Sequence, residues 1–126
     1  MSFKPFKNLL FGFAFSPSLK ANVYEVTRLA SYFNANLIFV HVGEKTKEKE
    51  QSFKNLLNKS PLKPKNIKTH WTEGDPVKTL IKTCLDFNVD LLLLGALKRE
   101  KLVTFYLGSI ARKLTRKAPC SVLLML

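Results

Sequence analysis

Apolar runs and amphipathic segments alternate along this chain, and the alternation is the feature that most constrains its fold. The runs at 9–15, 37–42 and 91–94 are almost uninterrupted stretches of hydrophobic residues, and SVLLML closes the sequence at 121–126. Short runs without a polar face are typical of parallel strands that are covered on both sides. The sequence therefore predicts a parallel sheet.

The segment after the first run has apolar residues at helical spacing. They are Val23, Val26, Leu29, Ala30 and Phe33. Ser16 can cap such a helix and Pro17 suits its first turn. We therefore expect an amphipathic helix from Ser16 and Pro17 to about Asn34.

Three more helices and an edge strand are expected further along. Residues 45–59 are highly charged and predict a short peripheral helix, anchored by Phe53 and two leucines. Residues 66–72 alternate in polarity, which is typical of an edge strand with one wet face. Asp75 as cap and Pro76 in the first turn open another helix, and residues 108–118 predict the last one.

This order of strands and helices predicts an α/β doubly wound domain, with a parallel sheet, right-handed crossovers and helices on both faces. With 126 residues and no linker or internal repeat, we expect a single domain over 1–126. In such sheets, ligands bind beyond the C-terminal strand ends, where the winding direction reverses. If the strands at 9–15 and 91–94 are neighbours, the site lies between residues 14–16 and 95–109.

Composition narrows the possible partners and compartments. The formal net charge of +12 favours anionic partners such as nucleotides, nucleic acid or acidic proteins, although solvated helix faces explain it equally well. No apolar stretch approaches the roughly 20 residues that span a bilayer, so we expect a cytoplasmic protein without membrane contact. Two cysteines and two histidines at wide spacing argue against a zinc site or a disulfide framework.

The loop GALKREKLVTFYLGS, residues 95–109, is the candidate binding segment. Gly95 ends a predicted strand, and Gly108 with Ser109 starts a helix whose free N–H groups could receive an anion. Two glycines this far apart are equally consistent with helix capping and tight packing. The loop therefore predicts a phosphate site or a structural turn.

Short motifs along the whole chain resemble those of the universal stress protein family. The resemblance is carried by Phe15-Ser16, His41-Val42, Gly74-Asp75-Pro76, Asn88-Val89-Asp90 before LLLLG, LGSIARKL, and Ala118-Pro119-Cys120. The resemblance implies a five-stranded parallel sheet in the order 3-2-1-4-5, with the adenine nucleotide alpha hydrolase-like fold. It also implies a dimer, since members of the family commonly dimerise along the last strand. Its nucleotide-binding branch carries the pattern G-x2-G-x9-G-[S/T].

When the pattern G-x2-G-x9-G-[S/T] is aligned with this chain, it is incomplete. Its first and third glycines are Gly95 and Gly108, followed by Ser109, but Lys98 stands where the middle glycine is expected. The family's nucleotide-contacting aspartate at the end of strand one is replaced by Ala14.

Other positions stay compatible with the family's site. Val42 stands where the family's backbone meets the adenine, and Ser16 follows the end of the first strand. The resemblance thus implies a degenerate site with the candidate residues Ser16, Val42, Gly95, Lys98, Arg99, Gly108 and Ser109.

The energies of the missing contacts indicate how far Lys98 and Ala14 weaken nucleotide binding. A residue other than glycine at positive φ costs about 1–2 kcal/mol, and a lost carboxylate hydrogen bond removes about 1.5–3 kcal/mol. Together they lower affinity by about two to three decades, and Lys98 and Arg99 offset part of this through charge-assisted contacts. We expect weak or no binding of ATP or another adenine nucleotide.

Catalytic and metal-binding roles have little support in the sequence. The proposed site contains no carboxylate pair, no nucleophile beside a histidine and no P-loop lysine motif, so we expect no enzyme activity. We expect His41 to end a strand, His70 to face solvent, and Cys84 to be an inert core thiol. Cys120 precedes the last strand and is the thiol better placed for redox chemistry.

Three hypotheses of function follow. The first is a non-enzymatic stress-response domain that forms a homodimer through its C-terminal strand and acts on an unidentified protein partner. The second is an ATP- or AMP-binding switch in which Lys98 and Arg99 replace the missing glycine. The third is binding of nucleic acid or an acidic protein by basic residues at 98–101 and 112–117.

Overall fold

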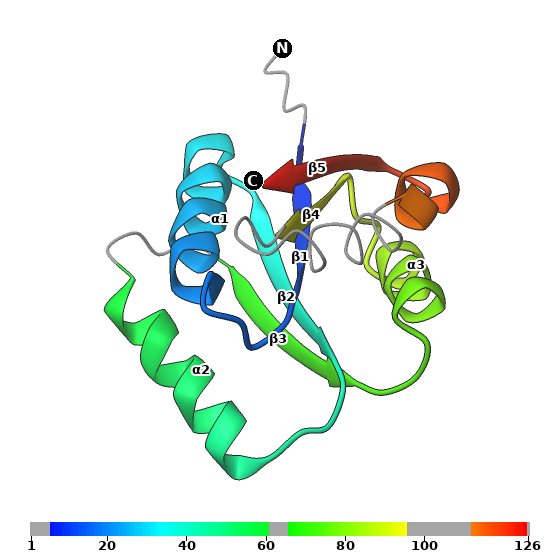
Figure 1. Ribbon diagram of the computed structural model, residues 1–126. Helices are drawn as coiled ribbons and strands as arrows, with labels where there is room; N and C mark the ends of the chain where they lie inside the picture. Colours follow the sequence, from blue (N-terminus) through cyan, green and yellow to red (C-terminus); the bar gives the residue numbers. More distant parts are fainter. Residues whose placement is uncertain (1–5, 61–65, 96–111, 126) are drawn as a thin grey trace.

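The five predicted strands form one sheet in a computed structural model that describes residues 6–60, 66–95 and 112–125 (Figure 1). The strands are β1 (Asn8–Phe13), β2 (Asn36–Val42), β3 (Ile67–Thr72), β4 (Leu91–Gly95) and β5 (Ser121–Met125). Their order is β3-β2-β1-β4-β5, and each neighbouring pair is parallel. The predicted doubly wound α/β fold and its strand order are confirmed.

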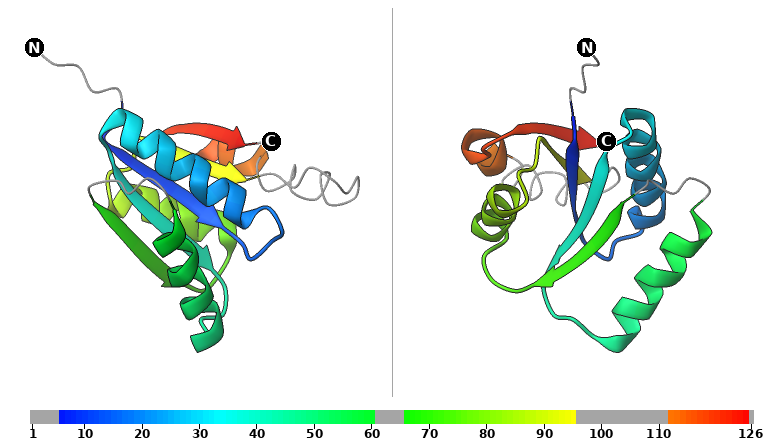
Figure 2. Two further views of the ribbon diagram at one scale, coloured as in Figure 1. Left: turned by 90° about the vertical axis from the view of Figure 1, so that its left-hand side faces the viewer. Right: turned by 180° about the vertical axis from the view of Figure 1, so that it is seen from behind.

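Helices cover both faces of this sheet, as the two views of Figure 2 show. The helices are α1 (Leu19–Phe33), α2 (Lys47–Lys59) and α3 (Pro76–Asp86), and residues 112–117 are also helical. Phe53 of α2 packs in one core cluster with the buried face of α1, whereas α3 and Leu114 pack in a second cluster. The sheet thus has α1 and α2 on one side and α3 with the 112–117 helix on the other.

Alternation along the strands distributes the core between these two sides. In β1, Leu9, Phe11 and Phe13 belong to the α1 and α2 side, whereas Leu10 faces α3. All four of these side chains are buried, so β1 is covered on both faces as its apolar sequence predicted. Gly12, also on the α3 side, leaves room for Leu80, whose methyl carbons would lie 3.1–3.2 Å from an added Cβ.

Side chains cap the starts of α2 and α3, and of these two caps Asp75 was predicted. Thr46 and Asp75 accept hydrogen bonds from the backbone N–H groups of Lys49 (3.1 Å) and Lys78 (2.9 Å), which fixes the starts of α2 and α3. Asn34 adopts a left-handed φ of 54° at the end of α1, where a residue of this kind is expected.

The predicted start of α1 was wrong. Its cap position is Ser18, and Ser16 lies in a preceding turn in which the Ser16 N–H bonds the Ala14 carbonyl at 2.9 Å. The Leu19 N–H then bonds the Ser16 carbonyl at 3.1 Å, so the chain completes this turn before the helix begins. For the same reason β1 ends at Phe13 and not at Phe15.

A ladder of asparagine side chains crosses the N-terminal edge of the sheet. Asn66 Nδ2 donates to Asn36 Oδ1 (2.7 Å), Asn36 Nδ2 donates to Asn8 Oδ1 (2.8 Å), and Asn8 Nδ2 donates to the Asn88 carbonyl (3.0 Å). Asp90 Oδ2 accepts from the backbone N–H groups of Lys7 and Asn8, both at 2.8 Å. These contacts tie the starts of four strands together.

Within the described part of the chain, no helix has the length and apolar character needed to cross a bilayer.

Candidate functional site

The winding direction reverses between β1 and β4, and the candidate site lies at the C-terminal ends of these strands. The two strands pair in parallel up to Gly12 and Leu94, and the α1 turn follows directly after β1. Three predicted site residues, Ser16, Val42 and Gly95, lie at this edge of the sheet. The other four, Lys98, Arg99, Gly108 and Ser109, lie outside the described residues.

Gly95 lies where the first turn of α1 comes close to the end of β4, so that a side chain here would require the Asn22 side chain to move. A Cβ atom added to Gly95 would lie nearer to Asn22 Nδ2 than side-chain carbons ever approach a neighbouring atom. The Gly95 backbone is not left-handed, so the missing side chain is what matters and not conformational freedom. The first glycine of the loop therefore has a packing role that is independent of any ligand.

The N-terminus of α1 is open in a way that those of α2 and α3 are not. The Ser18 side chain makes no capping hydrogen bond, and the first turn contains no acidic residue. Ser16, half-buried in the turn before it, uses its backbone N–H and carbonyl within the turn. Because the Leu19 N–H is bonded to the Ser16 carbonyl, the later N–H groups of the first turn and the helix dipole are what favours an anion at this end of the helix.

Aromatic side chains form a wall that continues from β1 to the site. Phe13 stacks on Phe53 with ring centroids 4.2 Å apart and an angle of 8°. Phe15 lies 5.1 Å from the His41 ring and is nearly parallel to Trp71 at 6.2 Å. The sequence held a signal for this wall, since aromatic residues recur at every second position from Phe11 to Phe15, but we did not predict it.

The Lys49 ammonium extends this wall, because its Nζ lies 5.9 Å from the Phe15 ring centroid. Ala14, between Phe13 and Phe15, is exposed to solvent. The end of β1 therefore presents a small apolar side chain and an aromatic ring, and neither can hydrogen-bond a ligand.

Val42 ends β2 on the opposite side of the sheet from the aromatic wall. Its half-buried side chain packs against the α3-side cluster, and its backbone pairs with Thr72 of β3. The structure thus brings Val42 to the same edge as the β1 turn.

His41 has a structural role. Its ring is buried, and because a carbonyl only accepts hydrogen bonds, Nδ1 must donate to the Phe13 oxygen at 2.9 Å. The ring thereby ties β2 to the end of β1. His70 is exposed on β3, where its ring lies 6.0 Å from that of Phe87.

The two cysteines are free thiols in the α3-side cluster. Burial raises the pKa of Cys84 to about 12, and the neighbouring Cys120 thiol adds to this increase. Burial also raises the pKa of Cys120. Both groups therefore carry their protons at neutral pH, which makes them poor nucleophiles. Over the described ranges, no three His, Cys, Asp or Glu side chains are grouped to hold a metal ion.

Comparison with solved structures shows that this fold is shared with universal stress proteins. One is a universal stress protein crystallised in complex with cAMP, which is 20% identical, with a TM-score of 0.77, over 96% of this chain and 97% of that chain. UspA from Lactobacillus plantarum is 21% identical, with a TM-score of 0.71, over 95% and 97% of the two chains. A family member from Burkholderia pseudomallei is 16% identical, with a TM-score of 0.72, over 98% of each chain.

The curated proteins contain no significant match to this sequence. The model of the universal stress protein family, by contrast, matches residues 43–125, which is more than half of the chain. The match starts directly after β2 and includes α2, β3, α3, β4 and β5. The chain belongs to the universal stress protein family.

Proposed function

We propose that this universal stress protein is a non-enzymatic stress-response domain that works as a homodimer, with a degenerate nucleotide site, through contact with a protein partner. The observation that carries the proposal is the end of β1. Exposed Ala14 and the ring of Phe15 offer no hydrogen bond where a nucleotide would need one. The uncapped start of α1 still favours an anion, so this half of the site attracts phosphate more than it recognises a base.

The contact energies available at this site support weak nucleotide binding. An open helix N-terminus stabilises a nearby anion by about 0.3–1 kcal/mol. A hydrogen bond to a charged group, which Ala14 cannot make, contributes about 1.5–3 kcal/mol. The neighbouring structure with cAMP supports an adenine nucleotide as the ligand class to test.

Thermal unfolding with millimolar Mg-ATP tests the site. Inorganic triphosphate at matched ionic strength is the control, because a chain with a net charge of +12 attracts any polyanion. A specific site at 100 times its dissociation constant would stabilise the fold by about 2.7 kcal/mol. We expect small and equal effects of the two ligands. A large effect of ATP alone would contradict the degenerate site.

Ala14→Asp is the matching gain-of-function variant. Position 14 is exposed, so a carboxylate there does not disturb the core. We expect ATP affinity to rise by about tenfold, the equivalent of one charge-assisted hydrogen bond. Ala14→Asn serves as the uncharged control. An unchanged affinity in Ala14→Asp would show that the missing carboxylate does not explain the weak site.

A nucleotide-responsive switch is the second candidate function. The absence of an acid or a side-chain cap in the first turn of α1 favours it, since phosphates could settle there with help from Lys98 and Arg99. Lys98→Ala and Ser109→Ala should each weaken ATP-induced stabilisation. If neither variant changes it, this candidate is wrong.

The homodimer is supported by the exposed apolar residues of β5. This strand ends the described sheet, and Leu123 and Leu124 are 39% and 42% exposed. An apolar edge strand is prone to pair with another chain. We expect sedimentation at micromolar concentration to give a dimer mass, which Leu124→Lys should reduce. Leu85→Lys, on α3 and 60% exposed, is the control for adding charge elsewhere. A monomeric parent chain would contradict the dimer.

The absence of catalysis is supported by how the reactive side chains are used. His41 Nδ1 donates its hydrogen bond to the Phe13 carbonyl. The pKa of the Cys84 thiol is raised to about 12, so this thiol is protonated at neutral pH. We expect no release of phosphate from Mg-ATP above the uncatalysed rate. Turnover that is lost in Ser109→Ala would contradict this part of the proposal.

A further inference from the structure

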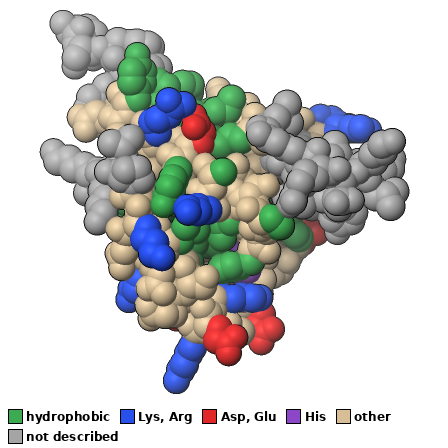
Figure 3. All heavy atoms as spheres, turned by 60° about the vertical axis from the view of Figure 1, so that its left-hand side comes forward, with side chains coloured by type: hydrophobic (Ala, Val, Ile, Leu, Met, Phe, Trp, Pro, Cys, Tyr) green, Lys and Arg blue, Asp and Glu red, His purple; other side chains and the backbone are tan. Residues whose placement is uncertain are grey.

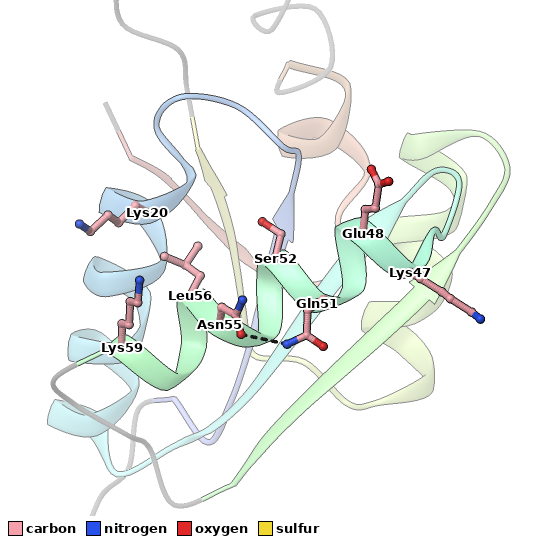
Figure 4. A pocket seen from close by; sticks show the side chains of 8 residues that line it. All are labelled: Lys20, Lys47, Glu48, Gln51, Ser52, Asn55, Leu56 and Lys59. Carbon is pink, nitrogen blue, oxygen red and sulfur yellow. Dashed lines mark hydrogen bonds between the residues drawn. The ribbon is translucent and has the colours of Figure 1, made fainter.

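A groove between α1 and α2 is lined by seven residues of α2 and by Lys20 in the first turn of α1. It is open to solvent and has a volume of about 700 Å³ (Figure 4). Lys20 of α1 and Lys59 of α2 stand at one end, and Lys47 stands at the other. The space-filling view of this side of the molecule shows Lys and Arg side chains spread over the face, with acidic side chains at its lower end and near its top (Figure 3).

Four of the seven α2 residues that line the groove lie along one helical stripe, and Lys47, Gln51 and Leu56 lie beside it. Glu48, Ser52, Asn55 and Lys59 are three or four positions apart, so they share a face, whereas Phe53 points into the core. From Lys47 to Lys59 the helix rises by about 18 Å. An extended peptide covers this length with about five or six residues.

The charge of the groove is positive and is not neutralised within the described residues. Three lysines and a single acid, Glu48, line the groove. The ion pairs among the described residues are Arg28–Glu25, Lys45–Glu50 and Lys82–Asp86, and none of them includes a groove lysine. The Lys20 ammonium lies 5.8 Å from the Tyr24 ring centroid, and the side chains of all three groove lysines are exposed and so can reach carboxylates of a partner.

Two side-chain amides in the middle of the groove suit a peptide backbone. Gln51 Nε2 donates to Asn55 Oδ1 at 2.9 Å, as the dashed line in Figure 4 shows. This bond leaves the Gln51 oxygen as an acceptor and the Asn55 nitrogen as a donor. A peptide group offers the complementary N–H and C=O. Leu56 adds an apolar contact beside them.

The lining disfavours single-stranded nucleic acid as the occupant. None of the described side chains that line the groove is aromatic, so bases would find no stacking surface. A peptide, by contrast, can use the lysines, the amide pair and the leucine together.

We propose that the groove between α1 and α2 is a docking site for an extended acidic segment of a partner protein. The proposed function supposes a protein partner but leaves its chemistry and its surface open, and this inference supplies both. The groove lies apart from β5, and it meets the nucleotide site only at the first turn of α1, where Lys20 lies. The Gln51 and Asn55 variants below change α2 alone, so the proposal can fail while the nucleotide and dimer proposals stand, and the reverse also holds.

The test is fluorescence anisotropy with a labelled decapeptide of alternating Glu and Ala, at physiological salt. Changing Lys20, Lys47 and Lys59 to Gln should weaken binding by about tenfold, since each exposed charge pair contributes modestly. The control changes Lys54, Lys78 and Lys113 to Gln, which removes the same charge from exposed positions outside the groove lining. This control should weaken binding by less than about threefold. A peptide with Gln in place of Glu should not bind.

A second variant separates hydrogen bonding from charge. Gln51→Ala with Asn55→Ala leaves the net charge unchanged and should weaken binding of the peptide by about threefold or more. Circular dichroism of each variant checks that α2 is intact.

Equal losses in the two lysine triples would overturn the proposal, because the interaction would then be diffuse attraction to a basic surface. Tighter, groove-dependent binding of oligothymidylate than of the peptide would also overturn it. So would a dimer mass that is lost in the groove variants, since a second copy would then be the occupant.

Discussion

Replacing Phe53 with Ala should detach α2 from the sheet. Along α2, Phe53 is the residue that is buried, with 2% of its surface exposed, and the helix is otherwise strongly polar. Its ring stacks on Phe13 at 4.2 Å and meets Phe39 edge-on at 5.1 Å. The partly buried Leu56 and Leu57 add weaker contacts. The position of α2, and with it the α1–α2 groove, therefore depends mainly on this ring.

The structure sets the size of the expected effect. Truncating a buried Phe to Ala costs about 3–5 kcal/mol, and the two aromatic pairs place this site in the upper part of that range. We expect a loss of about 4 kcal/mol from a total stability of about 5–15 kcal/mol. With a urea m-value of about 2 kcal/mol/M, the unfolding midpoint should fall by about 2 M.

Urea unfolding followed by two probes measures this loss. Far-ultraviolet circular dichroism reports all helices, and the fluorescence of Trp71, the one tryptophan of the chain, reports the aromatic wall. Lys54→Ala, the exposed neighbour on α2, should change stability by less than about 0.5 kcal/mol. A loss below about 1 kcal/mol in Phe53→Ala would refute the reasoning that this ring anchors the helix.

Three further predictions concern the sheet edges and the thiols. Asp90→Ala removes the acceptor for two backbone N–H groups at the start of β1, so it should lower the free energy of unfolding in urea by about 2 kcal/mol. A loss below about 0.5 kcal/mol would show that solvent replaces the carboxylate. Gly95→Ala should cost about 1–2 kcal/mol by crowding Asn22, and Asn22→Ala should relieve most of this cost in a double-mutant cycle, whereas strictly additive losses would argue against the contact. Cys84 should make stability fall at alkaline pH. Its pKa is raised from 9.0 to about 12 in the folded chain, so the unfolded chain ionises first. Below pH 9 the Cys84 thiol makes its full contribution to the free energy of unfolding. Between pH 9 and 12 this contribution falls by about 1.4 kcal/mol for each pH unit. The stability difference between the parent and Cys84→Ala should shrink over this range in urea unfolding, and parallel pH profiles would contradict the assignment.

Local sequence was sufficient for most of the fold. Uninterrupted apolar runs mark strands that are covered on both faces, and this pattern located β1, β2, β4 and β5 within about two residues. Cap residues act within one helical turn, so Asp75 and Asn34 could be recognised from their neighbours. The family also followed from short motifs along the chain, and the family model agrees with it.

The candidate site was predicted less completely. Ser16, Val42 and Gly95 do lie at the C-terminal edge of the sheet, because the alternation of strands and helices implies where that edge is. The sequence did not reveal that Gly95 makes room for Asn22, since these residues are far apart in the chain and meet through packing. The binding roles of all seven candidate residues stay predictions, and four of them, Lys98, Arg99, Gly108 and Ser109, lie outside the described residues.

Features that depend on contacts between distant segments could not be read from the chain. Ser16 and Ser18 are equally good caps by type, and the turn that joins β1 to α1 selects Ser18. The asparagine ladder requires the parallel register that sets Asn8 opposite Asn36. The α1–α2 groove exists because Phe53 holds a polar helix against the aromatic wall. Short-range periodicity and capping thus specify the elements, whereas register and side-chain packing, which join residues far apart in sequence, specify the surfaces that they create.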